Sequence, residues 1–122
     1  MLKVSKDATK LNLITCVVQR GKADKVWAAA RQAGAGGATI HFARGMGVRE
    51  RMGLLGVAIA PEKEVIVVVS FPAQTEKIFQ AIVKAGQLDV PGQGIVFTQP
   101  IDHCAGLIVS APKKRGARRK RT

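Results

Sequence analysis

The sequence predicts an α+β fold in which two βαβ units form one antiparallel sheet with two helices on one face. Three observations support this fold class. Runs of β-branched residues have the length of strands, and two segments between them place apolar residues at spacings of three and four. Glycine or proline stands at the ends of these segments and marks where each one stops.

The first half of the chain contains a strand, a helix and a second strand. Residues 11–19 are rich in Leu, Ile, Thr and Val, and Gly21 ends this strand. The helix follows, with Asp24 in its first turn where the helix dipole favours an anion, and it ends in the glycine-rich segment 34–37. Its apolar face consists of Ala23, Val26, Trp27, Ala30, Ala33 and Gly34. Residues 38–43 alternate in polarity and form the second strand.

The second half repeats the order of strand, helix and strand. Residues 65–71 form a third strand whose continuous apolar character predicts burial on both faces, and Pro72 ends it. Residues 75–86 repeat the helical spacing, and residues 94–99 form the fourth strand. The order βαββαβ, with both helices on one face of an antiparallel sheet, is the ferredoxin-like arrangement. This arrangement carries no function by itself.

The segment 44–63 between the second and third strands is the most informative part of the chain. A hairpin closes with about two to five residues, and a much longer connection usually has a function of its own. Glycines recur in the segment, and guanidinium groups stand beside large apolar side chains. We therefore predict that it contacts a partner through Arg44, Arg49, Arg51, Met52, Leu54 and Leu55.

Length and composition limit the class of protein. A chain of 122 residues forms one domain with a modest core, so we expect oligomerisation to add buried surface. The N-terminus lacks the apolar core of a secretory signal, and no apolar run is long enough to span a bilayer. The two cysteines, Cys16 and Cys104, fit a reducing compartment. These features predict a cytoplasmic protein.

Most of the net charge of +12 belongs to the C-terminus. Residues 113–122 hold seven of the 20 bases and no acid, which leaves 13 bases against 8 acids, a net +5, in the rest of the chain. A basic run without large apolar residues attracts anions but does not distinguish among them. The tail therefore predicts a contact with anionic lipid, nucleic acid or an acidic protein face, or a role in solubility alone.

Ordered landmarks from residue 11 to about residue 103 resemble the PII signal-transduction family, and the chain is identified as a member of a divergent PII-like branch. The landmarks are residues 13–18, 25–26, 37–40, 44–47, 59–61 and 65–69, the turn Gly92-Gln93-Gly94, and Phe97 with Pro100. The resemblance implies a homotrimer whose sheets face inward, effector clefts between subunits, and long loops that dock on a target protein such as a membrane transporter. It divides the chain into an N-terminal extension (1–10), a PII-like domain (11–109) that carries the 44–63 loop, and a basic tail (110–122).

The resemblance also implies where an effector binds. The residues that fall where the family surrounds an adenine nucleotide are Gly37, Thr39, Gly45 and Val68. The glycine-rich turn that wraps phosphates corresponds to Gly92, Gln93 and Gly94. The chemistry of a glycine turn is compatible with this role, because consecutive backbone amides in such a turn can form a nest for phosphate oxygens. Taken alone, such a turn can also serve only to reverse the chain before the fourth strand.

Several charged residues of the family pattern are absent. Gln93 and Ile95 stand where the family has an acid and a lysine, and Gly106 and Ile108 replace two arginines. Each lost charge-assisted contact to phosphate costs about 1.5–3 kcal/mol. These losses argue against classical triphosphate binding and indicate a smaller ligand, or substitute cations from the loop or the tail. The glutamine that the family uses with ATP, magnesium and 2-oxoglutarate is replaced near Val48 or Arg49, and the chain has no tyrosine to modify.

Two other classes of site find little support in the spacing. His41, His103, Cys16 and Cys104 are of types that bind zinc or copper, but they form no compact ligand motif, so we expect no metal site. The eight acids are scattered, and no nucleophile, histidine and acid have the spacing of a catalytic set. We therefore expect no enzyme activity and no required cofactor.

The alternative to a PII-like regulator is a nucleic-acid-binding protein with a basic tail. Ferredoxin-like sheets bind single-stranded RNA by stacking bases on exposed strand aromatics. This chain has no tyrosine, and we expect its phenylalanines to pack in the core; they are Phe42, Phe71, Phe79 and Phe97. The preferred prediction is a cytoplasmic homotrimer that senses a small effector, an adenine nucleotide, and acts on a target that can recruit it to the membrane.

Overall fold

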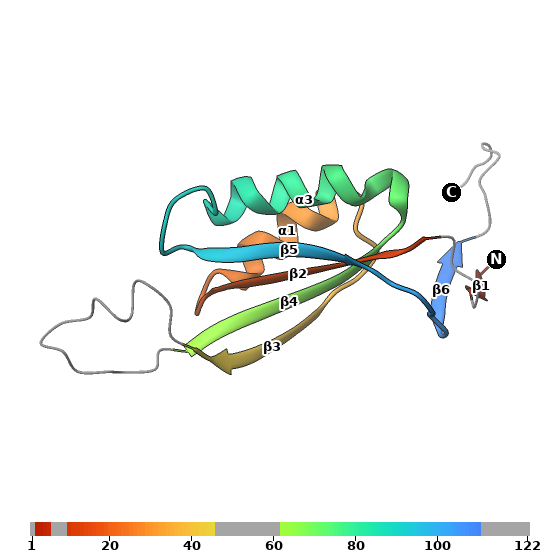
Figure 1. Ribbon diagram of the computed structural model, residues 1–122, viewed down its shortest axis with the longest axis horizontal. Coiled ribbons are helices and arrows are strands. Elements are labelled where there is room, and N and C mark those ends of the chain that lie inside the picture. The colour runs from red at the N-terminus through yellow and green to blue at the C-terminus, as the bar shows by residue number, and fades with distance from the viewer. Residues whose placement is uncertain (1, 6–9, 46–61, 111–122) are drawn as a thin grey trace, which may run out of the picture.

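The predicted element order is confirmed. The computed structural model describes residues 2–5, 10–45 and 62–110. Six elements follow the order βαββαβ: β2 (Asn12–Gln19), α1 (Ala23–Gln32), β3 (Thr39–Arg44), β4 (Glu62–Ser70), α3 (Pro72–Gly86) and β5 (Gly94–Pro100). Both helices cover the same face of the sheet (Figure 1). The fold class is therefore ferredoxin-like, as the sequence predicts.

The main sheet has the strand order β3-β4-β2-β5, with antiparallel pairing throughout. β2 is central, and it pairs with β4 from Asn12↔Ser70 to Gln19↔Lys63. On its other side, β2 pairs with β5 from Asn12↔Pro100 to Val18↔Gly94. This order leaves β3 and β5 as the two edge strands, so segments far apart in sequence meet where β2 ends and β4 and β5 begin.

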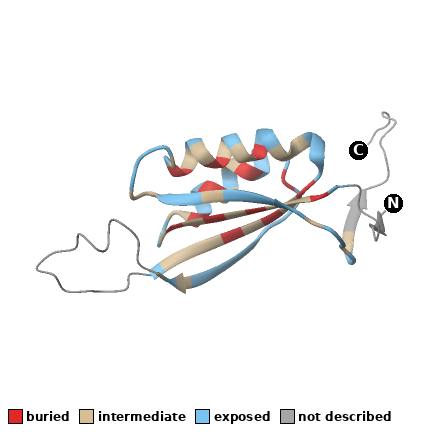
Figure 2. Cartoon of the chain, viewed as in Figure 1, coloured by how far each residue is buried: buried red, intermediate tan, exposed pale blue. Residues whose placement is uncertain are grey.

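The core lies between the central strands and the two helices (Figure 2). Every second residue of β2 and β4 points into it, as the two-residue period of a strand requires. Its fully buried large side chains are Leu11, Ile14, Cys16, Val18, Val26, Ile66, Val68, Ile78 and Ile82. Trp27 is half-buried against this cluster. Within the described ranges, neither helix is long and apolar enough to span a membrane.

The helix ends follow local signals, with one exception. Pro72 occupies the first turn of α3, where its missing N–H costs nothing, and the helix ends at Gln87 with a left-handed φ of 55°. α1 ends just before Gly34, whose φ is +117°. The exception is the start of α1, because its N-cap residue Lys22 offers no side-chain hydrogen bond to the first turn. The first amides of α1 must therefore find acceptors elsewhere.

The prediction that residues 65–71 are buried on both faces is wrong for the single chain. In β4, Ile66, Val68 and Ser70 are buried, whereas the alternate residues Val65, Val67 and Val69 are only partly buried. The reason is that the helices cover one face of the sheet and no described element covers the other (Figure 2). The strand also begins earlier than predicted, at Glu62.

The prediction that the phenylalanines pack in the core is wrong for three of the four. Phe42 is 67% exposed, Phe71 43% and Phe97 40%. Phe42 lies on the edge strand β3, beyond the cover of the helices, and Phe97 pairs with Thr15 on the face that the helices leave open. Phe71 lies at the junction between β4 and α3. Only Phe79, in α3, is largely shielded.

A second small sheet lies outside the predicted fold. β1 (Leu2–Ser5) pairs with β6 (Leu107–Ser110) in antiparallel register from Leu2↔Ser110 to Ser5↔Leu107. Neither strand is among the predicted elements, and residues 1–10 are predicted only as an N-terminal extension. Figure 1 shows this pair beyond the end of the main sheet that lies opposite the start of β4. It brings the two ends of the domain together.

Candidate functional site

The candidate site is built around the turn Gly92-Gln93-Gly94, which leads from α3 into β5. The turn depends on glycine at both ends, since φ is +86° at Gly92 and +147° at Gly94. A Cβ at Gly94 would lie 2.3 Å from the carbonyl oxygen of Val17. Gly94 thus has a structural reason to be glycine, whatever the turn binds.

The turn is held by side chains from the end of β2 and the start of α1. Gln19 Nε2 donates a hydrogen bond to the carbonyl oxygen of Gly92 at 3.4 Å. Lys22 Nζ donates to Gln93 Oε1 at 2.5 Å. Both contacts join residues more than 70 positions apart in sequence. The connection between β2 and α1, residues 20–22, therefore positions the glycine turn.

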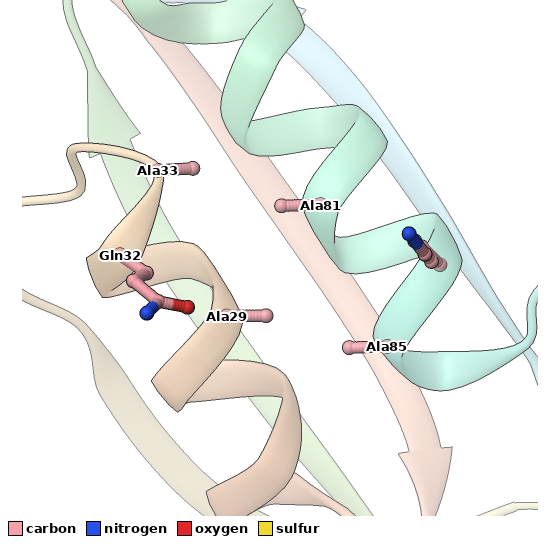
Figure 3. Close-up of a pocket in the computed structure, with 6 residues that line it drawn as sticks. Ala29, Gln32, Ala33, Ala81 and Ala85 are labelled. Carbon is pink, nitrogen blue, oxygen red and sulfur yellow. The ribbon is translucent and has the colours of Figure 1, made fainter.

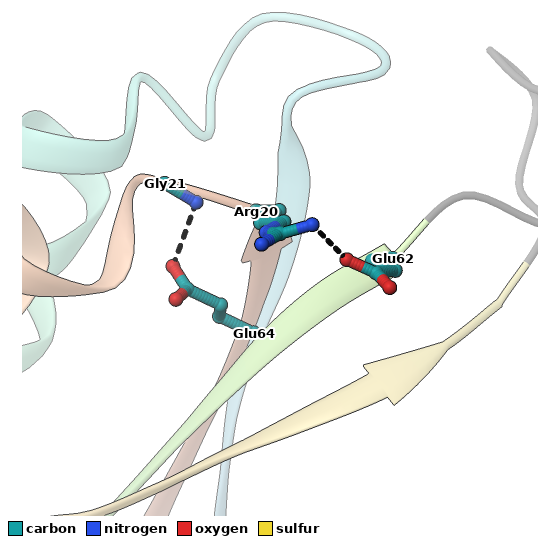
Figure 4. A network of polar contacts seen from close by, with 4 residues as sticks. All are labelled: Arg20, Gly21, Glu62 and Glu64. Carbon is teal, nitrogen blue, oxygen red and sulfur yellow. Dashed lines mark hydrogen bonds and ion pairs between the residues drawn. The ribbon is translucent and has the colours of Figure 1, made fainter.

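The same connection is joined to β4, close to the point where the 44–63 loop returns to the sheet. Glu64 Oε1 accepts the backbone N–H of Gly21 at 2.9 Å and that of Ala23 at 2.8 Å. Arg20 forms an ion pair with Glu62, and both of these side chains are more than half exposed (Figure 4). Glu64 supplies the acceptor that Lys22 does not offer, and so it caps α1 from a distant strand.

Arg20 also lies over the ring of Phe42 on β3, with its guanidinium carbon 6.0 Å from the ring centroid. The connection between β2 and α1 therefore contacts both strands that flank the 44–63 loop. Because the same short segment also holds the glycine turn, one network joins the predicted phosphate-binding turn to the base of the predicted partner loop. The contacts of this network join residues 22 to 73 positions apart in sequence, so no local pattern in the chain predicts it.

The structure does not bring the other predicted ligand residues to this turn within one chain. Gly37 and Thr39 are exposed at the start of β3, and Gly45 follows its end. The five-residue rise of β3 places Thr39 roughly 17 Å from Arg44. Gly45 lies at the same end of the sheet as the glycine turn, but at the opposite edge, about 14 Å away across β4 and β2. The predicted site is thus split between the two edges of the sheet.

Val68 presents a different situation. Its side chain is 1% exposed and packs in the core between the sheet and the helices. A ligand could reach this residue only through its backbone. The side chain of Val68 therefore has a packing role in the core, and the family resemblance that predicts Val68 as a ligand residue can apply only to its backbone.

The predicted partner-contact residues lie almost entirely outside the described chain. Arg44 is the last residue of β3 and is exposed. The remaining five, Arg49, Arg51, Met52, Leu54 and Leu55, lie outside the described residues. Arg44 belongs to β3, and Glu62 and Lys63 belong to β4, so the two ends of the predicted 44–63 segment lie on neighbouring antiparallel strands.

The face of the sheet that the helices leave open is apolar. Its outward residues on the central strands include Leu13, Val17, Val65, Val67 and Val69, all of them partly buried. Toward the β5 edge it continues with Ile95, which is 56% exposed, and Phe97. An apolar face of this kind on a small domain is typical of a surface that is buried in an assembly.

Two further features do not form part of the site. A shallow groove of about 470 Å³ runs between α1 and α3, lined by Ala29, Gln32, Ala33, Ala81, Lys84 and Ala85 (Figure 3). None of the predicted ligand residues lines it. Cys16 is buried in the core, and burial raises the pKa of its thiol from 9.0 to about 12. No group of three or more His, Cys, Asp or Glu side chains suited to a metal ion occurs in the described part of the chain.

Comparison with known proteins agrees with this architecture. Residues 11–107 match the family model described as nitrogen regulatory protein P-II. A solved structure of Arabidopsis thaliana PII bound to citrate aligns with a TM-score of 0.61 and 19% sequence identity, and the alignment covers 77% of this chain and 79% of that one. At this identity the structural match shows a shared fold. A comparison with curated protein sequences found no match. Because the family model spans most of its length, the chain belongs to the nitrogen regulatory protein P-II family.

Proposed function

We propose that the protein is a homotrimeric P-II-like regulator that binds a small effector, an adenine nucleotide, in clefts between subunits. The effector would control the docking of the 44–63 loop on a target protein, and we propose a membrane transporter as the target. The family consists of signalling regulators and not enzymes. The proposal extends this regulatory role to a specific ligand class and a specific mode of assembly.

The observation that carries the proposal is the division of the predicted site between the two edges of the sheet. Gly37, Thr39 and Gly45 lie along β3, and the glycine turn leads into β5. A cleft that places the β3 edge of one copy beside the β5 edge of the next would bring the two halves together. One chain alone cannot do so, because β4 and β2 lie between them.

The open face of the sheet supports the same assembly. Val65, Val67 and Val69 form an outward apolar row in the middle of the sheet, and β2 adds Leu13 and Val17 beside it. Burial of apolar surface contributes about 25 cal/mol per Å², so a trimer that covers this face gains substantial stability. The helices remain on the outside of such a trimer, which agrees with their exposed charged residues.

The proposed signal passes from the glycine turn to the loop through the connection between β2 and α1. Gln19 and Lys22 contact the glycine turn. Arg20 and Gly21 contact Glu62 and Glu64 at the start of β4. An effector that binds one loop conformer more tightly than another shifts the population toward that conformer. The target would then read the loop conformer.

The assembly is tested with a pair of glutamate substitutions. Val67→Glu places a charge in the middle of the open sheet face, whereas Ala28→Glu places the same side chain on an exposed position of α1. We expect sedimentation to show a trimer for the parent and for Ala28→Glu, and dissociation for Val67→Glu. A monomeric parent, or a Val67→Glu variant that remains trimeric, would contradict the proposed interface.

The ligand is tested by thermal shift and calorimetry with ATP, ADP, AMP, cyclic nucleotides, 2-oxoglutarate and bicarbonate. An effector at 100 times its dissociation constant adds about 2.7 kcal/mol to the free energy of unfolding. We expect an adenine nucleotide to give this shift. If none of the nucleotides stabilises the trimer, the nucleotide part of the proposal is wrong.

The nucleic-acid alternative gains one observation, since Phe42 and Phe97 are exposed on strands. However, Phe97 lies opposite Thr15 on the open face, while Phe42 lies opposite Glu64 on the helix-side face. The two rings therefore do not form one stacking surface. Binding through the tail alone predicts a log-log salt slope of about −6 for seven phosphate contacts, without sequence preference. Deletion of residues 113–122 would abolish such binding.

A further inference from the structure

A lysine from another part of the chain reaches the glycine turn. Lys22 lies between β2 and α1, and its Nζ donates to Gln93 Oε1 at 2.5 Å. The two residues are 71 positions apart, so this contact is a product of the fold. A lysine ammonium group carries three donors. Gln93 is the one acceptor that the described chain gives it, which leaves two N–H groups for another acceptor.

Within the described residues, no carboxylate forms a salt bridge with Lys22, and the nearby Arg20 pairs with Glu62. The nearby Glu64 accepts two backbone amides of the α1 terminus. At the turn itself, the residue between the two glycines is a neutral glutamine. Lys22 therefore brings a positive charge to the turn that no acidic side chain balances.

The turn offers a second kind of donor. Gly92 has no side chain to shield its backbone, and its φ of +86° lies in the left-handed region. The next amide, that of Gln93, donates to the carbonyl oxygen of Val90 at 3.3 Å. No described residue accepts the Gly92 N–H. The turn therefore carries two kinds of donor, the Gly92 amide and the ammonium group of Lys22. Charge-assisted hydrogen bonds of this kind are about twice as strong as neutral ones.

We propose that Lys22 is the cation that pairs with the phosphate of the effector at the Gly92–Gly94 turn. In this arrangement a phosphate oxygen accepts one of the two N–H groups of Lys22 Nζ that Gln93 Oε1 leaves unused. The position after the turn, Ile95, provides no charge, so the cation comes from the connection between β2 and α1. The inference rests on the proposed function, because it names the residue that recognises the anionic part of that effector.

The test compares Lys22→Gln with Lys25→Gln in the full-length chain. Lys25 is an exposed lysine three residues further along, in α1, so both variants lose one charge near the same helix end. Calorimetry with ADP, inorganic pyrophosphate and adenosine separates the phosphate contribution from that of the base. We expect Lys22→Gln to weaken ADP and pyrophosphate binding about tenfold or more, with adenosine binding unchanged. Lys25→Gln should bind all three as the parent does.

Two more variants sharpen the result. Lys22→Arg keeps the charge and should retain more of the ADP affinity than Lys22→Gln. Gln93→Glu places a carboxylate against Lys22 and should weaken ADP and pyrophosphate binding while Lys22 is intact. The thermal midpoint of each variant shows whether it is folded.

The outcomes distinguish the two proposals. If the parent binds ADP and Lys22→Gln binds it equally well, Lys22 is not the phosphate partner, and the proposed function stands. If Lys22→Gln loses adenosine affinity to the same extent as ADP affinity, Lys22 acts on the fold of the site and the inference is wrong. If the parent binds neither ADP nor pyrophosphate, both proposals fail.

Discussion

Gly94→Ala is the substitution whose effect the structure defines most sharply. Two separate costs arise at this position. The backbone φ of +147° lies in a region that residues with a side chain rarely adopt, and the new Cβ would lie 2.3 Å from the carbonyl oxygen of Val17. The neighbouring atom belongs to the backbone of the central strand β2, so it cannot move aside without disturbing the pairing of β2 with β5.

Two other glycines separate these costs. Gly106 has a positive φ of +94° but nothing within 4 Å of an added Cβ, whereas Gly36 has neither a positive φ nor a close neighbour. A positive φ costs about 1–2 kcal/mol in a residue with a side chain, and forced overpacking adds about 1–3 kcal/mol. We therefore expect a loss of roughly 2–4 kcal/mol for Gly94→Ala, about 1–2 for Gly106→Ala, and no more than about 0.5 for Gly36→Ala.

Urea unfolding followed by the fluorescence of Trp27 measures these differences, because Trp27 is the single tryptophan and is half-buried against the core. All proteins are compared at one concentration, since assembly makes stability depend on concentration. With a slope of about 2 kcal/mol per M, the midpoint of Gly94→Ala should fall by about 1–2 M. If Gly94→Ala unfolds at the same midpoint as Gly36→Ala, the described turn is wrong. Equality with Gly106→Ala would contradict only the close approach to Val17.

Three further predictions follow from the described contacts and from the loop. Glu64→Gln should lower the free energy of unfolding by about 1 kcal/mol, because Glu64 caps α1 through two amides. The control, Glu76→Gln on the exposed face of α3, should change the free energy of unfolding by less than about 0.5 kcal/mol. Equal effects of the two substitutions would argue against the cap. Burial raises the pKa of Cys16 to about 12, so the buried thiol contributes stability that is complete below pH 9 and is lost as the pH rises toward 12. In equilibrium unfolding, the free energy of unfolding of Cys16→Ala should fall less between pH 9 and 11 than that of the parent. Parallel curves of this free energy against pH for the two proteins would count against a role of the Cys16 thiol. Arg49→Ala combined with Arg51→Ala should weaken capture of the target far more than it lowers the thermal midpoint; unchanged capture would remove the proposed role of the loop.

The parts of the fold that depend on neighbouring residues could be read from the sequence. The helical spacing of apolar residues and the glycines after position 33 locate α1 within a few residues of its observed end. Pro72 marks the boundary between β4 and α3. These signals act over a few positions of the chain, so they need no knowledge of the partner elements.

The errors concern which faces are covered. β4 reads as a strand buried on both sides, but in the single chain only one of its faces meets helices. Phe42 and Phe97 read as core residues, yet they lie on edge strands of the sheet. Hydrophobic character in the sequence shows that a residue can be buried, but only the arrangement of layers shows what covers it.

The sequence by itself determined the family, the order of the elements and the glycines of the turn between α3 and β5, because these are properties of residue type and spacing. The tertiary structure decided which side chains meet at that turn. Glu64 caps a helix that begins 41 positions before it, and Lys22 reaches a turn 71 positions after it. The physical reason is that antiparallel pairing of β2 with both β4 and β5 brings three strand ends to one place. No local pattern in the chain records which side chains occupy that place.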